Sequence, residues 1–359
     1  RREKYPNAEQ TARSLEMIYR TFMVKRLESS FVAFKASLAN FRKATQDMVD
    51  MFDRDQVIIA PDLKIGELLS QGKTFEEIIE KGKQKLGLEE EDFVFNADSF
   101  DPAFADELKA DIAILDAMIA EWQQVTEDPK LEEFLCQAAV AFFGKPENPS
   151  GKLVIFTESK DTGRYIEAAL KSRLQRTDVL YVSSDNRSEQ FDTIRSNFDA
   201  NIEPAKQRDD FNILVTTDVL SEGVNLHRSN VIINYDTPWN AVRMMQRIGR
   251  VNRIGSIAGK IINYMFYPSM QGNQEIHLYS NALIKLQGFH SAFGEDAQIY
   301  SREEIVKEFQ MFNPDIQDAV DRNLKFLEEA RELYRTHRKL YNSIKALPMK
   351  SRTVREIEK

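Results

Sequence analysis

The chain has 359 residues, of which 42% are hydrophobic and 30% are charged. This composition is typical of a globular protein, and the length allows two or three domains. The formal net charge of −8 gives no global attraction to nucleic acid, so binding to a phosphate backbone would need a local basic patch. The single cysteine excludes a disulfide framework and fits a cytoplasmic location.

Several classes of site and segment are not expected. The four histidines are scattered without the spacing of metal ligands, so we predict no metal site. No apolar run approaches the roughly 18 residues of a membrane span, so we predict no membrane contact. Cys136 falls on the apolar side of a helical pattern and is expected to be a packed thiol. Because the sequence starts without Met or a signal peptide, we expect a longer parent protein.

The first 150 residues are predicted to be largely helical. Residues 12–46 show apolar side chains at alternating spacings of four and three, which predicts one helix. Residues 53–100 are less regular, and a second helix is predicted around Leu108 to Trp122. A third helix is predicted from about Lys130 to Phe143, ending at Gly144. We interpret 1–52 as a helical lead-in and 53–150 as a helical insertion.

From residue 151 the hydrophobic period changes. Short apolar runs alternate with helical segments, which indicates an α/β domain over 151–268 with a parallel sheet and helices on both faces. Residues 269–359 are predicted to be a helical extension with a basic tail. The predicted strands are 153–157, 179–182, 211–216, 231–235 and 260–266.

The loop after the third predicted strand is the first candidate site, because ligands of open parallel sheets bind beyond the carboxyl ends of the strands. Residues 216–226 carry hydroxyl, carboxylate and amide groups, and Gly223 would permit a close backbone approach. An alternative is a capped turn, with Asp218 or Ser221 as the N-cap and Gly223 as a helix stop. The residues alone favour the capped turn.

The second candidate site is a helix that contains Gln246, Arg250 and Arg253. The three side chains are predicted to share one face. Two guanidinium groups there would suit a triphosphate presented from another lobe, where an arginine finger stabilises the transferring phosphoryl group. The spacing equally allows a basic surface face, or arginines paired with Asp218 or Asp236.

Together these segments resemble a known family. The block made of residues 213–226, 231–240 and 246–255 looks like motifs V and VI of superfamily-two helicases. Residues 153–170 look like motif IV. The pattern is most similar to the Swi/Snf-related group. The resemblance implies a RecA-like C-terminal lobe of an ATP-dependent helicase or translocase.

The resemblance also implies roles for individual residues. Arg253 is the expected arginine finger, and Arg250 is the second catalytic arginine. Gln246, Glu222 and Gly223 are expected beside the nucleotide. The residues expected to contact nucleic acid or to couple it to the nucleotide are Thr157, Thr217, Asp218, Asn225 and Trp239.

The cofactor implied is ATP with Mg²⁺, held mainly by a first lobe with a phosphate loop. Gly72-Lys73-Thr74 does not fit such a loop, and Thr74 to Glu77 is predicted to be a capping box that opens a helix. We therefore expect the first lobe to lie outside this sequence and to be a partner, with residues 1–52 leading in from its end. DNA is the expected substrate, with RNA as an alternative. The competing hypothesis is a non-catalytic scaffold that binds nucleic acid or a protein.

Overall fold

The computed structural model describes residues 8–60, 63–87, 89–143, 147–238 and 241–272, together with Arg338. The chain divides into two compact units, 1–282 and 283–359, and almost all described residues belong to the first. Trp239, Gly144 and the helical extension predicted beyond residue 272 lie outside the described residues, apart from Arg338. Among the described residues, no helix is long and apolar enough to cross a membrane.

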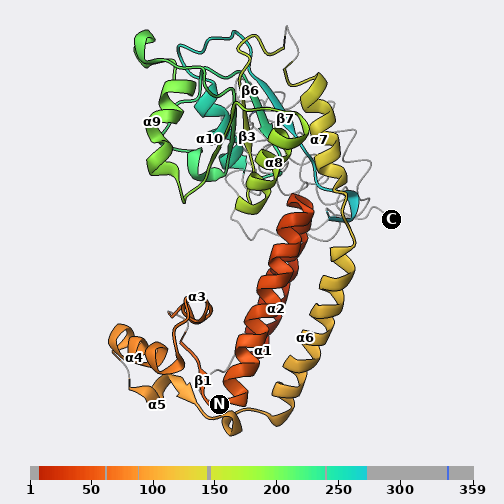
Figure 1. Ribbon diagram of the computed structural model, residues 1–359, viewed down its shortest axis with the longest axis vertical. Coiled ribbons are helices and arrows are strands. Elements are labelled where there is room, and N and C mark those ends of the chain that lie inside the picture. Colours follow the sequence, from red (N-terminus) through yellow and green to blue (C-terminus); the bar gives the residue numbers. More distant parts are fainter. Residues whose placement is uncertain are drawn as a thin grey trace. The chain divides into compact units, whose positions relative to one another are not determined.

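A five-stranded parallel sheet forms the centre of the α/β part (Figure 1). The strand order is β4-β5-β3-β6-β7, and every neighbouring pair is parallel. The predicted parallel sheet is therefore confirmed, with each strand within a few residues of its predicted position. The strands are β3 (Leu153–Phe156), β4 (Val179–Val182), β5 (Ile213–Thr216), β6 (Val231–Asn234) and β7 (Ile262–Met265).

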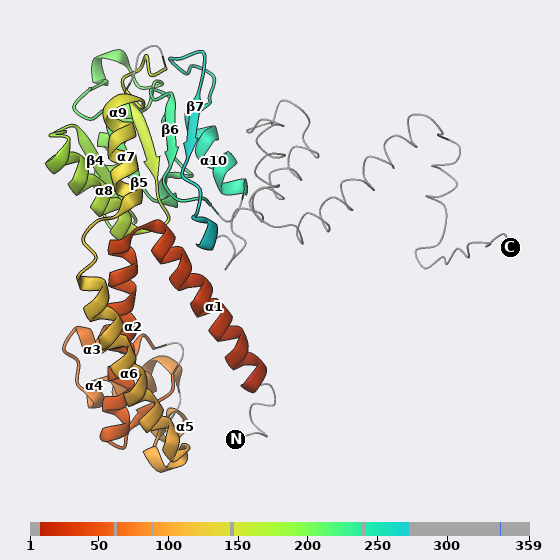
Figure 2. The ribbon, with the colours of Figure 1, turned by 90° about the vertical axis from the view of Figure 1, so that its right-hand side faces the viewer.

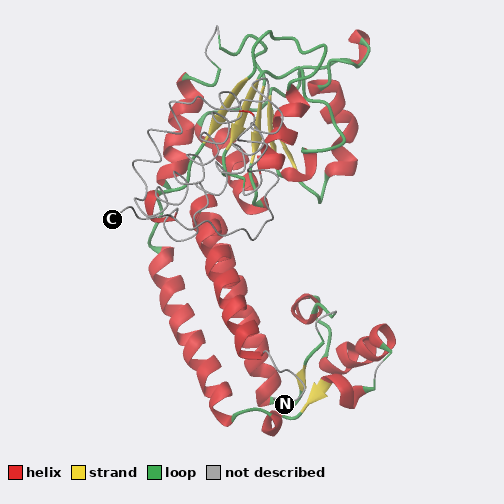
Figure 3. Ribbon diagram, turned by 180° about the vertical axis from the view of Figure 1, so that it is seen from behind, coloured by secondary structure: helices red, strands yellow, loops and turns green. Residues whose placement is uncertain are grey.

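Helices cover both faces of this sheet, as predicted (Figures 2 and 3). Successive side chains of a strand point to opposite faces. Leu153 and Ile155 of β3 therefore pack with α7 and α8, whereas Val154 and Phe156 pack with α9 and α10. The helices are α7 (Pro129–Val140), α8 (Lys160–Arg173), α9 (Arg187–Phe198) and α10 (Ala241–Val251).

α7 lies in the segment that the sequence analysis assigned to the insertion, yet it packs against the sheet. Leu131, Phe134 and Leu135 are buried there. The packed thiol predicted at Cys136 is wrong, because Cys136 is exposed. The helical pattern turns Leu135 toward the sheet and its neighbour Cys136 to the surface.

The N-terminal helices form an arm in which α2 and α6 run side by side (Figure 1). The single helix predicted over 12–46 is wrong. The helix is interrupted at Ser30, whose backbone is extended with φ −165°. The Ser30 hydroxyl caps the next helix by accepting a hydrogen bond from Ala33 N at 3.1 Å. Apolar periodicity continues through the break and so does not reveal it. The helices are α1 (Ala8–Ser29), α2 (Phe31–Asp53) and α6 (Pro102–Gln123).

The segment that connects α2 to α6 along the chain folds into a small unit with its own hydrophobic core. It contains an antiparallel pair of short strands in addition to helices. The predicted capping box is confirmed, because Thr74 and Glu77 each accept a hydrogen bond from the other's backbone amide. The elements are β1 (Val57–Ile58), α3 (Ile65–Ser70), α4 (Phe75–Leu86), α5 (Glu90–Phe93) and β2 (Val94–Phe95). Short 3₁₀ turns elsewhere are η1 (Ala97–Ser99), η2 (Pro204–Lys206) and η3 (Asp218–Leu220).

Candidate functional site

The loop after β5 begins as a 3₁₀ turn and then passes through a left-handed glycine. Ser221 Oγ donates to Asp218 O at 2.7 Å, which closes the turn. Gly223 has φ +79°, and a Cβ there would lie 2.8 Å from Arg187 Nη2. The N-cap expected at Asp218 or Ser221 is wrong, because Thr217 holds the N-cap position of the turn without a side-chain hydrogen bond and Ser221 follows the turn.

This loop lies against α10. Leu226 N donates to Arg250 O at 2.9 Å, which fixes the loop to the end of the helix. Gln246 Nε2 donates to Glu222 Oε1 at 2.8 Å. Two residues predicted to lie beside the nucleotide are therefore brought into direct contact.

Arg253 does not share a helix face with Arg250, and that prediction is wrong. α10 ends at Val251, and Arg253 lies in the turn that follows. Its backbone N–H donates to Val251 O at 3.1 Å and to Ser256 Oγ at 3.1 Å. Its Nε donates to Gly249 O at 3.2 Å, so the exposed side chain folds back over the helix end. A helix C-terminus favours such a cation.

Arg250 is partly buried, and its Nε has no hydrogen-bond partner among the described residues. Burial lowers the pKa of the Arg250 guanidinium, and the positive charge of Arg253 lowers it further. Within the described ranges neither arginine forms an ion pair, so the pairings with Asp218 or Asp236 considered from the sequence do not involve them. The Glu222 carboxylate opposes this lowering but forms no ion pair with Arg250, so an external anion could still pair with the two arginines.

A hollow of about 300 Å³ brings four predicted site residues together: Gly223, Asn225, Arg250 and Arg253 all line it. Its remaining wall comes from Val224, from the face of α9 and from Asp199. Asn225 Nδ2 donates to Asp199 Oδ2 at 3.3 Å.

Asp218 has a different environment from the other residues of its loop. Its carboxylate accepts hydrogen bonds from Arg247 Nε at 2.9 Å and Nη2 at 2.6 Å, and it also pairs with Arg243. Arg247 is fully buried, and its Nη1 donates to Asn234 Oδ1 at 2.8 Å. Arg247 is not among the site residues predicted from the sequence. The only available signal was its place one turn before the end of a helix with a strongly apolar face.

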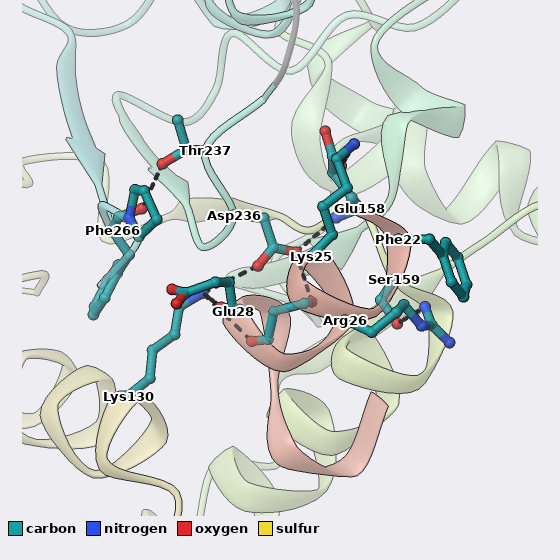
Figure 4. A pocket seen from close by; sticks show the side chains of 12 residues that line it. Phe22, Lys25, Arg26, Glu28, Lys130, Glu158, Ser159, Asp236, Thr237 and Phe266 are labelled. Atoms are coloured by element: carbon teal, nitrogen blue, oxygen red, sulfur yellow. Dashed lines mark hydrogen bonds and ion pairs between the residues drawn. The ribbon is translucent and has the colours of Figure 1, made fainter. Parts of the chain in front are cut away.

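Asp236, which follows β6, lies beside Glu158, which follows β3 (Figure 4). The buried Asp236 carboxylate accepts hydrogen bonds from Thr157 Oγ1 at 2.6 Å, Glu158 N at 2.8 Å and Ser29 Oγ at 3.0 Å, and Lys130 Nζ lies at 3.1 Å. Burial raises the pKa of Asp236, but Lys130 and the hydrogen bonds outweigh it and leave the pKa below its ordinary value. Asp236 thus connects the sheet to α1 through Ser29 and to α7 through Lys130.

A small hollow of about 170 Å³ lies beside this joint. It contains the Glu158 side chain, whose pKa is raised by burial although Lys25 Nζ lies 3.6 Å away. Arg26 closes one side by donating to Ser159 Oγ at 2.7 Å and to Asp161 Oδ2 at 2.6 Å. The three cations around this hollow, Lys25, Arg26 and Lys130, each already form an ion pair with a carboxylate of the protein.

Thr157 is buried and its hydroxyl is used by Asp236, so in this conformation it is not exposed to a nucleic-acid strand. Thr217 is half-buried at the start of η3. Their contacts with a strand stay predictions, as does that of Trp239. Among the described residues, no group of three or more acidic, histidine or cysteine side chains could hold a metal ion.

Comparison with known proteins shows a similarity for this part of the chain. Residues 131–255 match the helicase conserved C-terminal domain. The uncharacterized ATP-dependent helicase YqhH of Bacillus subtilis is 34% identical over 104 residues, covering 29% of this chain and 17% of the relative.

Other relatives act on different nucleic acids according to their names. Probable ATP-dependent RNA helicase DDX28 of Mus musculus is 28% identical over 152 residues, covering 41% of this chain and 26% of the relative. ATP-dependent DNA helicase mph1 of Sclerotinia sclerotiorum is 30% identical over 158 residues, covering 41% of this chain and 12% of the relative. The chain thus spans about a quarter or less of these relatives' lengths.

Among solved structures, the C-terminal part of the Fun30 ATPase domain is 14% identical with a TM-score of 0.33, covering 69% of this chain and 85% of that chain. At this TM-score the likeness assigns neither function nor subgroup.

Proposed function

We propose that this chain is the second motor lobe of an ATP-dependent helicase or translocase. In this proposal Arg253 acts as the arginine finger and Arg250 as a second phosphate-binding arginine. A separate lobe with a phosphate loop presents ATP and holds most of the Mg²⁺ coordination. The observation that carries the proposal is the pair of guanidinium groups beside a hollow, without a carboxylate partner among the described residues.

The arrangement suits phosphoryl transfer for a physical reason. Charge develops on the oxygens of the transferring group, and a guanidinium presents a planar set of donors that keeps its charge at any relevant pH. The arginines belong to one lobe and the nucleotide to another, so the site would be complete only when the lobes close. Gln246, Glu222 and Gly223 would then lie next to the nucleotide.

Nucleic acid is proposed to bind mainly through its phosphate backbone, with little sequence preference. Thr157, Thr217, Asn225 and Trp239 are the proposed contacts. Asp218 is proposed to couple binding to hydrolysis, because its contact with buried Arg247 links the loop after β5 to α10. DNA is the proposed substrate with RNA as the alternative, a cytoplasmic location is proposed, and the Swi/Snf-related group is the proposed subgroup.

The test is ATP turnover by the complete motor, meaning this chain together with its phosphate-loop lobe. Arg253→Ala should lower kcat roughly a thousandfold or more, because the transferring charge loses its donor. Arg208→Ala removes an exposed arginine outside the hollow and should leave kcat unchanged. Parental turnover in Arg253→Ala would overturn the finger assignment. The chain alone should not hydrolyse ATP above background.

Stimulation by nucleic acid separates the motor from a non-catalytic scaffold. ATPase measured with duplex DNA, single-stranded DNA and RNA at two salt concentrations should rise with the preferred substrate and weaken as salt increases. Binding of nucleic acid without any ATP turnover by the complete protein would support the scaffold instead.

A further inference from the structure

α9 supplies one wall of the hollow, and none of its residues was predicted as a site residue. Arg187, Phe191 and Arg195 are four residues apart and therefore share one face of this helix. Arg187 Nη2 donates to Glu222 O at 3.1 Å, which shows that the face is turned toward the loop after β5. Phe191 and Arg195 line the same hollow as Arg250 and Arg253. α9 and α10 cover the same face of the sheet (Figure 1).

Arg195 has the properties of a positioned anion-binding group. Its guanidinium carbon lies 5.7 Å from the centroid of the Phe191 ring, within the range of a cation–π attraction. In the described part of the chain Arg195 forms no ion pair. Phe191 is 37% exposed and lines the hollow, so part of its ring surface is open to it.

The charges of the hollow favour a polyanion. Three arginines line it against one carboxylate, Asp199. Asp199 is already used, because it accepts hydrogen bonds from Asn225 Nδ2 at 3.3 Å and from Asn201 N at 2.9 Å. Several guanidinium groups around one space bind a ligand with several negative oxygens better than a single anion.

We infer that Arg195 binds the phosphate chain of the nucleotide beside Arg250 and Arg253, and that Phe191 is a positioning residue for its guanidinium. This inference rests on the proposed motor function. It assigns Arg195 to ground-state binding of the phosphates and leaves the finger role to Arg253.

The first test uses the chain by itself with inorganic tripolyphosphate, measured by calorimetry at low salt. Arg195→Ala should weaken binding about tenfold, as expected for loss of a charge-assisted hydrogen bond. Arg208→Ala changes the net charge equally but lies outside the hollow, and it should change affinity less than twofold. Arg195→Lys should restore part of the affinity, because it keeps the charge and loses the planar fork.

The second test separates binding from chemistry in the complete motor. Arg195→Ala should raise the KM for ATP about tenfold and change kcat less than threefold, the pattern of lost uniform binding. Phe191→Leu should raise KM in the same direction by a smaller factor. A melting curve for each variant shows whether the lobe is still folded. If the melting temperature is unchanged, the rise in KM comes from the hollow and not from unfolding.

The outcomes distinguish this inference from the motor proposal. Unchanged KM in Arg195→Ala, with kcat abolished in Arg253→Ala, would overturn the role of Arg195 and leave the motor intact. Parental kinetics in both variants would remove the motor proposal as well. A loss of binding to single-stranded DNA in Arg195→Ala, with tripolyphosphate binding unchanged, would overturn the inference by placing Arg195 on a nucleic-acid backbone.

Discussion

Arg247 and Asp218 form an ion pair in which the arginine is completely buried, with Nη2 at 2.6 Å from Oδ1. The Arg247 guanidinium also lies over the Phe156 ring, with its carbon 5.1 Å from the centroid. One side chain of α10 therefore contacts the loop after β5, strand β6 through Asn234, and strand β3 through Phe156. This contact sets the position of α10, and hence of Arg250, relative to the sheet.

Removing the Arg247 side chain should destabilise the lobe strongly. Arg247→Ala leaves the Asp218 carboxylate partly buried with only Arg243 as a cation, and loss of one partner of a buried pair costs about 3–5 kcal/mol. Arg243→Ala removes the other cation, whose side chain is 53% exposed, and should cost less than about 1 kcal/mol. Urea unfolding of the two variants measures the difference. Equal, small losses would show that the buried pair does not hold α10 in place.

Asp236→Asn should change how stability depends on pH. The folded pKa of Asp236 is lowered, so its stabilising contribution is present above the unfolded value of about 3.9 and is lost as pH falls through the folded pKa. The variant should therefore be less stable than the parent at pH 7, and the gap should shrink below about pH 4. Unfolding free energies measured from pH 7 to pH 3 test this. A difference in unfolding free energy that does not change with pH would contradict an ionised Asp236 in the folded protein.

His227→Leu should remove a different pH dependence. The His227 ring is fully buried and neither nitrogen has a hydrogen-bond partner among the described residues. Burial lowers its pKa, so the unfolded chain takes up a proton near pH 6.5 before the folded chain does. Parental stability should fall as pH drops below about 6.5, and this slope should be absent in the leucine variant. Identical slopes between pH 7 and pH 5 would show that His227 does not titrate on unfolding.

Alanine substitution should destabilise the protein at Gly223 and not at Gly249, and the two glycines therefore serve as a matched pair. Gly223 has φ +79°, a conformation that should cost about 1–2 kcal/mol for alanine. Gly249 lies inside α10 with nothing within 4 Å of an added Cβ, so alanine there should be neutral or stabilise by up to about 1 kcal/mol. Thermal unfolding of the chain compares them. Stabilisation by alanine at both positions would argue against the left-handed turn.

Much of the α/β architecture could be predicted, because each strand is a short apolar run and three of the strands, β3, β4 and β6, are followed by a helix. The helix breaks could not. The N-cap Ser30 is one polar residue inside an unbroken apolar stripe, and its break is fixed by contacts with distant residues such as Thr162 and Asp128. The end of α10 before Arg253 was likewise not evident, because Ser256, three residues further along, closes the turn.

The sequence by itself determined the parallel sheet, the helices on both faces and the short motifs that resemble a helicase C-terminal domain, since these depend on local periodicity and on short ordered motifs. Only the tertiary structure decided which charges are used internally and which are left for a ligand. Asp218 pairs with Arg247 rather than with Arg250, and α9 adds Arg195 to the hollow, because burial and three-dimensional proximity, not spacing along the chain, decide which charges can meet.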